Sequence, residues 1–386
     1  MATEYNYDSI RPYKDEEVKA VIERMTEDPE VIGVIQTLFP DKETKEVVQW
    51  LRSMRSIYDF QSQLIAPLIL RSLDMTGSTY SLNGFEMVEK EKEHLFISNH
   101  RDIIMDAGIL NTLMNRHGIT TTENAIGDNL CARPWITDAL KLNKSFLVRR
   151  SGTKRELFEA FQVLSSYIRS AITSGRTSIW IAQREGRAKD SDDRTQESLL
   201  KMFSISGKES VKKGFMDLNI IPVSFSYQYD SCDYLKAKEF QQKRDDAEFK
   251  KSPADDVLSM KVGVMGFKGD VHIQITDSIN EEIDRIVGEE DDRQTVIDKV
   301  AVIIDRKIHA NYRIYPNNYV AMDNLRGNTQ HLGSQYTQEE KNQFESYVEK
   351  QIEKIDLPNK DMEFLRERFW TMYANPLINH LAAKAQ

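Results

Sequence analysis

The chain lacks the features that mark secreted, metal-binding and membrane-spanning proteins. Its 386 residues include only two cysteines, Cys131 and Cys232, too few for a disulfide framework or a zinc site, and this scarcity favours a reducing compartment. The longest nearly unbroken apolar run, 64–70, is far shorter than the ~20 residues of a spanning helix. The first residues carry acids and aromatics where a secretory signal has a basic start and an apolar stretch. We therefore expect a cytoplasmic protein without a metal or redox cofactor.

Positive charge is also in deficit overall, but it is concentrated at one place. The formal net charge is −9, which argues against general nucleic-acid binding. Six of the fifteen residues from 141 to 155 are nevertheless basic and none is acidic. Since 146–148 has the pattern of a buried strand, Arg149 and Arg150 would emerge at a strand end, where α/β proteins bind ligands. Arginine forks match phosphate oxygens, so the cluster predicts an anion site, with a solvated surface as the alternative.

The hydrophobic pattern predicts an α/β fold with a mixed, mostly parallel sheet flanked by helices. Residues 81–316 alternate strand-like runs with helical segments such as 154–174. The runs are 95–98, 146–148, 177–182, 220–227 and 271–275. We expect a helical N-terminal region over 1–80, the α/β domain over 81–316, and a helical C-terminal extension over 317–386 that includes helices at 339–355 and 361–384.

The N-terminal region carries an apolar stripe. Between 43 and 75 apolar residues recur at helical spacing, and Pro67 predicts a kink or break. We favour packing of this stripe against the rest of the protein over contact with a membrane surface.

The most informative motif joins a histidine to an aspartate. The run 95–98 delivers His100 to its end, and Asp106 follows six residues later. An aspartate bonded to one ring nitrogen leaves the other nitrogen free to take a proton from a hydroxyl. Six helical steps of about 100° would separate the two side chains by about 240°, so His100 must lie in the turn before a helix. Asp102 is the rival partner or, as we favour, the N-cap of a helix beginning at Ile103.

Three further segments follow in order. They are Gly127-Asp128-Asn129-Leu130 continuing to Phe146-Leu147-Val148-Arg149-Arg150, Ile179 to Arg187 with Glu185-Gly186-Arg187 at its end, and Ile220-Ile221-Pro222-Val223-Ser224-Phe225. With the histidine motif, these resemble the four ordered blocks of the glycerol-phosphate acyltransferase superfamily, and the likeness is best to the glycerol-3-phosphate acyltransferase branch. It covers about half the chain, from 80 to 280, and its specificity comes from the order of the four blocks.

Two features depart from the family pattern. His100 and Asp106 have five residues between them where the family usually has four, so the additional residue must be absorbed in the turn or in a π-bulge. The run Glu185-Gly186-Arg187 is one residue shorter than the family's third block. The resemblance implies that Glu185 organises the acceptor site and Arg187 helps to hold its phosphate, but the deletion leaves Arg184 as an alternative to Arg187.

The resemblance implies an O-acyltransferase that moves a fatty acyl group from a thioester to glycerol-3-phosphate or its mono-acylated form in phospholipid synthesis. Acyl-carrier protein and coenzyme A offer the same thioester, so both remain open as donors. The expected catalytic residues are His100 and Asp106, and the expected substrate-binding residues are Arg149, Arg150, Glu185, Gly186 and Arg187. Lipid products imply peripheral contact with an anionic membrane surface on its inner face. The alternatives are another lipid-precursor acceptor and a non-catalytic module that binds acyl carriers or membrane.

Overall fold

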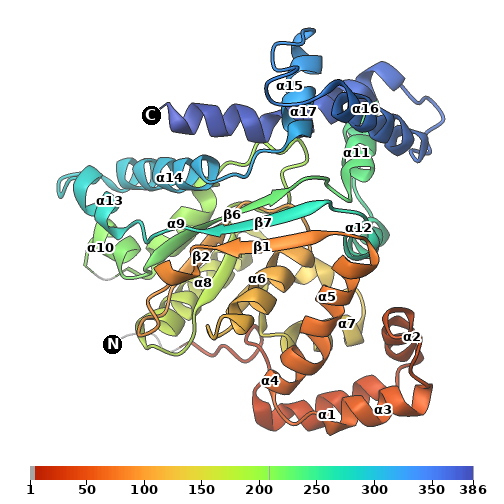
Figure 1. The fold of residues 1–386 in the computed structure, drawn as a ribbon. Helices are drawn as coiled ribbons and strands as arrows, with labels where there is room; N and C mark the ends of the chain where they lie inside the picture. Colours follow the sequence, from red (N-terminus) through yellow and green to blue (C-terminus); the bar gives the residue numbers. More distant parts are fainter. Residues whose placement is uncertain (1–4, 208, 386) are drawn as a thin grey trace.

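A single seven-stranded sheet organises the computed structural model, which describes residues 5–207 and 209–385 (Figure 1). The strands are β1 (Thr79–Asn83), β2 (Leu95–Ser98), β3 (Glu123–Gly127), β4 (Ser145–Val148), β5 (Ile179–Ala182), β6 (Ile220–Tyr227) and β7 (Asp270–Ile275). Their spatial order is β1-β7-β6-β2-β5-β3-β4. Strands β6, β2, β5, β3 and β4 run parallel, whereas β7 is antiparallel to β6 and parallel to β1. The predicted mixed, mostly parallel α/β sheet is confirmed.

Helices cover both faces of the sheet because its central strands are apolar on both sides. In β2, Leu95 and Ile97 face one layer and Phe96 faces the other. The first layer contains α8 (Lys154–Thr173), α9 (Glu197–Ile205), α10 (Val211–Met216), α13 (Asn280–Ile286) and α14 (Arg293–Ala310). The second contains α5 (Ala66–Met75) and α6 (Met105–Arg116).

The N-terminal helices form a separate apolar cluster, seen at the lower right of Figure 1. They are α1 (Asp15–Thr26), α2 (Pro29–Leu38), α3 (Thr44–Ser53) and α4 (Ile57–Asp59), and they pack with α7 (Pro134–Leu142). Val47, Leu51 and Leu64 are buried in this cluster, so the apolar stripe is internal packing. The predicted kink or break at Pro67 corresponds to a junction, because the π-helical turn η1 (Phe60–Ile65) gives way there to α5, which has Pro67 in its first turn. A further break comes earlier, where α3 ends at Ser53.

The C-terminal residues form a fourth apolar cluster, at the top of Figure 1. It consists mainly of α15 (Pro316–Arg326), α16 (Gln338–Glu353) and α17 (Met362–Lys384) with part of α11 (Asp233–Asp245). The predicted helices at 339–355 and 361–384 correspond to α16 and α17. The remaining helices are α12 (Pro253–Met265) and the short 3-10 turns η2 (Phe85–Met87) and η3 (Asp128–Leu130). None of the helices within the described residues combines the length and apolar character needed to cross a bilayer.

Candidate active site

His100 and Asp106 form a direct pair at the end of β2. His100 Nδ1 lies 2.8 Å from Asp106 Oδ2, and the Asp106 side chain is 0% exposed while that of His100 is 14% exposed. With Nδ1 donating to the carboxylate, the other ring nitrogen, Nε2, is left as a proton acceptor. The edge of the indole ring of Trp180 confines the imidazole, with the two ring centres 5.9 Å apart. The predicted pairing is therefore present in the geometry of a general base and its orienting carboxylate.

Three other donors hold the Asp106 carboxylate. The backbone N–H groups of Arg101 and Asp102 donate to Oδ2 at 2.7 and 3.0 Å, and the Tyr227 hydroxyl donates to Oδ1 at 2.8 Å. Burial, and then the Asp106 charge, raise the pKa of Tyr227 well above its usual value, so the phenol stays protonated. Tyr227, the last residue of β6, therefore fixes the carboxylate from the strand beside β2.

Asp102 closes the loop between β2 and α6. Its Oδ1 accepts hydrogen bonds from the N–H groups of Ile104 and Met105, each at 2.9 Å. These bonds close a turn before the helix, and the prediction that Asp102 is the N-cap of a helix beginning at Ile103 is wrong, because α6 begins at Met105 and its N-cap position is Ile104, which has no side-chain cap. The loop 101–104 absorbs the additional residue between His100 and Asp106, without a π-bulge. Burial, and then the neighbouring Asp106, raise the pKa of Asp102.

A cavity of about 380 Å³ opens in front of His100, beyond the carboxyl ends of β2, β3, β4 and β5. Ligands in open α/β sheets bind at this edge because the loops after the strands converge there. Of the predicted site residues, His100, Arg150, Glu185, Gly186 and Arg187 line the cavity. Arg149 does not line it. Its guanidinium instead bonds to the Ser151 carbonyl and to Glu156 at the surface.

The cavity lining is rich in basic residues. It contains five of them against two acids, Glu185 and Asp256. The basic residues are Arg150, Arg184, Arg187, Lys189 and Lys251. Two guanidinium nitrogens, Arg184 Nε and Arg187 Nη1, are buried without a hydrogen-bond partner among the described residues. Buried donors without partners are costly, so these two are suited to an incoming anion.

The backbone at the ends of β3 and β5 makes room for these arginines. A Cβ on Gly127 would lie 2.9 Å from Arg150 Nε, so glycine allows that side chain to pass close to the strand end. Arg150 Nη1 then pairs with Glu185 Oε1 at 3.1 Å. Gly186 has φ +68°, a left-handed conformation that glycine adopts without strain, and it turns the chain between Glu185 and Arg187.

Apolar residues also line the cavity. Several come from β3, β4, α8 and α9. They are Ala125, Ile126, Val148, Phe161, Leu164, Leu199 and Met202. The lining of one cavity thus combines His100, basic side chains and apolar side chains.

Sequence reasoning missed Tyr227 and Trp180, although both lie on runs that were identified as strands. Their contacts to Asp106 and His100 span more than seventy residues of sequence, and only the strand order β6-β2-β5 brings them together. The available signal for Tyr227 was a tyrosine at the end of a predicted strand, β6, which pairs with the strand before His100.

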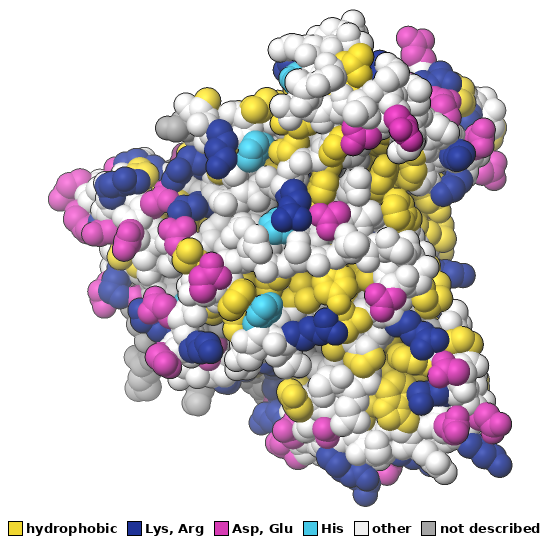
Figure 2. Space-filling model, in the orientation of Figure 1, with side chains coloured by type: hydrophobic (Ala, Val, Ile, Leu, Met, Phe, Trp, Pro, Cys, Tyr) yellow, Lys and Arg dark blue, Asp and Glu magenta, His cyan; other side chains and the backbone are white. Residues whose placement is uncertain are grey.

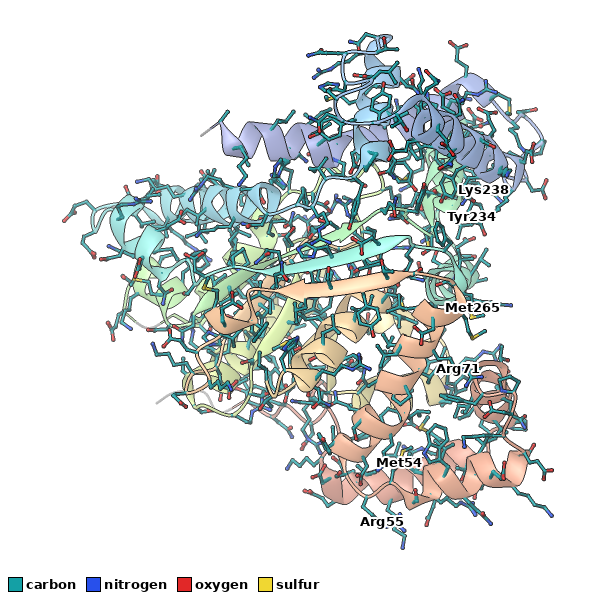
Figure 3. The ribbon with its side chains drawn as sticks, in the orientation of Figure 1. Met54, Arg55, Arg71, Tyr234, Lys238 and Met265 are labelled. Carbon is teal, nitrogen blue, oxygen red and sulfur yellow. The ribbon has the colours of Figure 1, made fainter. Side chains whose placement is uncertain are left out.

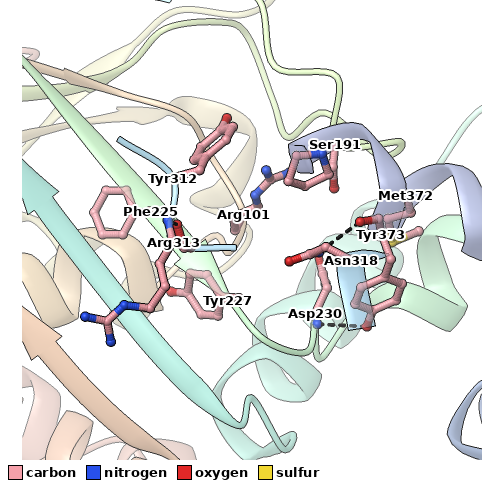
Figure 4. A pocket seen from close by; sticks show the side chains of 12 residues that line it. Arg101, Ser191, Phe225, Tyr227, Asp230, Tyr312, Arg313, Asn318, Met372 and Tyr373 are labelled. Atoms are coloured by element: carbon pink, nitrogen blue, oxygen red, sulfur yellow. Dashed lines mark hydrogen bonds between the residues drawn. The ribbon is translucent and has the colours of Figure 1, made fainter. Parts of the chain in front are cut away.

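A second, much smaller hollow is lined by Tyr227, which bonds to Asp106, together with Arg101, Asp230 and Tyr373 (Figure 4). Its volume of about 20 Å³ is the space of a single water molecule, which is too small for a substrate. Within the described residues, no three histidine, cysteine, aspartate or glutamate side chains converge as they would around a metal ion.

No protein-family model matches the chain, and no curated protein matches its sequence. Among solved structures, the crystal structure of the 1-acyl-sn-glycerophosphate (LPA) acyltransferase PlsC from Thermotoga maritima is similar. The match covers 74% of this chain and 94% of that chain, with 11% sequence identity and a TM-score of 0.39. At this identity and TM-score the likeness carries no functional argument.

Proposed function

We propose that this chain is an O-acyltransferase that transfers an acyl group from a thioester to the hydroxyl of a phosphorylated glycerol. The observation that supports this most strongly is that His100, paired with Asp106, lines the same cavity as basic and apolar side chains. A phosphorylated glycerol presents an anion and a hydroxyl within a few ångströms, and an acyl thioester presents a long apolar chain. The cavity lining contains side chains suited to each.

In the proposed reaction His100 Nε2 removes the proton from the acceptor hydroxyl as that oxygen attacks the thioester carbonyl carbon. Asp106 stabilises the imidazolium that forms and keeps the ring in place. The tetrahedral intermediate then collapses, the carbon–sulfur bond breaks, and the imidazolium returns the proton to the departing thiolate. The products are an ester and a free thiol, and no covalent acyl-enzyme is needed.

The acceptor phosphate is proposed to bind Arg150, Arg184 and Arg187. The unmet donors on Arg184 and Arg187 support this assignment for both, so we propose that the two act together rather than as alternatives. Glu185 contributes by holding Arg150 through their ion pair. We assign no contact with the acceptor to Arg149, because its guanidinium is bonded to Ser151 and Glu156.

The test is release of free thiol from acyl-coenzyme A and from acyl-carrier protein, each with glycerol-3-phosphate, its mono-acylated form, or glycerol. We expect thiol release that depends on a phosphorylated acceptor, with ester product in equal amount. Equal rates with glycerol would contradict a phosphate-binding role for the arginines. If no donor and acceptor pair releases thiol above the rate without enzyme, the proposed function is wrong.

A further inference from the structure

Helix α12 leaves several apolar side chains exposed to solvent, although the apolar side of a surface helix usually faces the core. Val257, Leu258 and Met265 are 41%, 44% and 38% exposed. On the helix these residues, with Ala254 and Lys261, fall within an arc of about 100°. We call these five residues the α12 face. Phe267, 46% exposed, extends it just beyond the helix end.

The side of α12 that faces the protein carries mostly small residues and lies against the loop 101–104, which contains Asp102. Its buried residues are Ser259, Met260 and Gly263, and a Cβ on Gly263 would come within 2.1 Å of Asp102 Oδ2. Packing of α12 therefore depends on close backbone approach at Gly263, with Met260 buried beside it, while Val257, Leu258 and Met265 remain exposed. Figure 3 shows Met265 at the edge of the molecule, and along the same margin in Figure 2 hydrophobic side chains gather with lysine and arginine between them.

The α12 face begins at the mouth of the active-site cavity. Lys251 and Asp256, which line that cavity, lie just before and within the first turn of α12, and Asp256 accepts a bond from Asn129 of the opposite rim at 3.3 Å. The next turn carries Val257 and Leu258 into solvent. An exposed apolar surface is thus continuous with the entrance of the cavity.

The charge of the face complements phosphate groups. Lys261 is its only charged residue and has no carboxylate within ion-pair distance among the described residues. The acids of α12 are engaged at its N-terminus, where Asp255 bonds to Ser252 and Asp256 bonds to Lys251. Lysine can lay its aliphatic stem along apolar surface while its ammonium group reaches the phosphates of a bilayer interface, so Lys261 suits contact with phospholipid.

We propose that the α12 face is the surface by which this chain docks on a phospholipid bilayer, so that the cavity opens onto the lipid. This inference rests on the proposed function, since a lipid product leaving the cavity needs an apolar exit. A second copy of the chain on this face would cover the entrance, which favours the bilayer as the occupant.

The test is flotation of the full chain with phosphatidylcholine vesicles, with and without phosphatidylglycerol. We expect the chain to float with the anionic vesicles, and we expect binding of the double variant Leu258→Glu, Met265→Glu to fall about tenfold or more. Lys261→Glu should weaken binding to anionic vesicles more than to neutral ones. Val302→Glu is the matched control, because Val302 is 59% exposed on α14 and should leave flotation unchanged.

A second measurement separates this proposal from the proposed function. Transfer from a short-chain acyl thioester to glycerol-3-phosphate without vesicles should be unchanged in the double variant. A chain that transfers acyl groups but does not float overturns the docking surface alone, whereas a chain that floats through the α12 face but consumes no thioester overturns the function alone. The docking surface is also wrong if the double variant floats like the control, or if wild type is a dimer that the variant converts to monomers.

Discussion

Asp106 accepts four hydrogen bonds, two of them from backbone N–H groups of the loop that carries His100. A carboxylate satisfied on both oxygens cannot rotate without losing several bonds at once, so it holds the imidazole in one orientation. Tyr227 is the only one of the four donors that comes from a different strand, β6. It acts on the reaction through Asp106 and is therefore a positioning residue.

Replacing Tyr227 by phenylalanine tests that role. We expect kcat to fall about 5- to 30-fold with KM nearly unchanged, the effect of removing about 1–2 kcal/mol of a hydrogen bond to a charged group. Tyr336→Phe is the control, since that hydroxyl also bonds a buried aspartate, Asp323, away from the site. An equal loss of kcat in both variants, or a loss that appears in KM instead of kcat, would contradict a positioning role.

The neighbouring arginines at the end of β4 provide a second test. Arg150 lines the cavity and Arg149 does not. We expect Arg150→Ala to raise the KM for a phosphorylated acceptor about 10- to 150-fold, because a charge-assisted bond contributes roughly 1.5–3 kcal/mol. Arg149→Ala should remain close to wild type. Initial rates at varied acceptor concentration measure both, and a larger effect at Arg149 would reverse the assignment.

At the scale of elements, the sequence predicted strands where they are apolar on both faces. Strands β2, β4, β5, β6 and β7 were all identified from such runs, and the structure confirms them. Strand β1 lies at the sheet edge and buries only Leu82, so it gives almost no hydrophobic signal. Strand β3 lies inside the sheet, next to the edge strand β4, but contains buried Glu123 and Asn124, whose partners Tyr167, Arg176 and Asn111 become visible only in the fold.

In the candidate site, too, the sequence predicted contacts between residues close in the chain but not contacts between distant ones. His100 and Asp106 are close in sequence, so local reasoning could pair them, whereas the N-cap predicted at Asp102 lies at Ile104 because the loop after His100 is longer than expected. The choice between Arg149 and Arg150 depends on a turn of one residue at a strand end, which no hydrophobic pattern encodes. The contact between Gly263 of α12 and Asp102 of the loop 101–104 joins residues about 160 positions apart. No pattern in the sequence predicts this contact.

The close approach of Gly263 to Asp102 predicts that even a small side chain at position 263 disturbs the packing of α12. Its added Cβ would meet the Asp102 carboxylate, so we expect Gly263→Ala to lower the free energy of unfolding by about 1–3 kcal/mol and to lower kcat as the loop shifts. Gly33→Ala on α2 is the control. It meets no atom within 4 Å and should raise stability by about 0.5–1 kcal/mol. Denaturant unfolding and initial rates measure both variants, and a stability gain at Gly263 equal to that at Gly33 would contradict close packing of α12.

At the scale of the whole molecule, a buried carboxyl links the C-terminal helices to the rest of the fold. Asp233 at the start of α11 accepts bonds from Tyr347 of α16 and Tyr373 of α17, at 2.7 and 2.8 Å. Burial raises the pKa of Asp233 to about 7, despite these donors. The folded protein therefore holds this proton more tightly than the unfolded chain, in which the group has an ordinary pKa near 3.8.

Protonated Asp233 therefore stabilises the folded protein at low pH. The stabilising contribution of the protonated group is fully present below about pH 4 and is lost as the pH rises through about 7, a change of up to roughly 4 kcal/mol. We expect Asp233→Asn, which cannot ionise, to gain stability relative to wild type as the pH is raised from 4 to 8. Urea unfolding at several pH values measures this difference. A difference that does not change with pH would show that Asp233 is already ionised in the folded protein at low pH.

The central claim is that Asp106 and His100 act as one general base in acyl transfer. The most direct measurement is the single-turnover rate of thiol release, with glycerol-3-phosphate as acceptor, in wild type and in His100→Ala, Asp106→Asn and Asp102→Asn. We predict that His100→Ala and Asp106→Asn each lose about 10²–10⁴-fold in rate while keeping the wild-type unfolding transition. Asp102→Asn retains an oxygen that can accept the N–H bonds of Ile104 and Met105, and it should keep most of the rate. A rate preserved in His100→Ala, or lost in Asp102→Asn and kept in Asp106→Asn, would contradict the account.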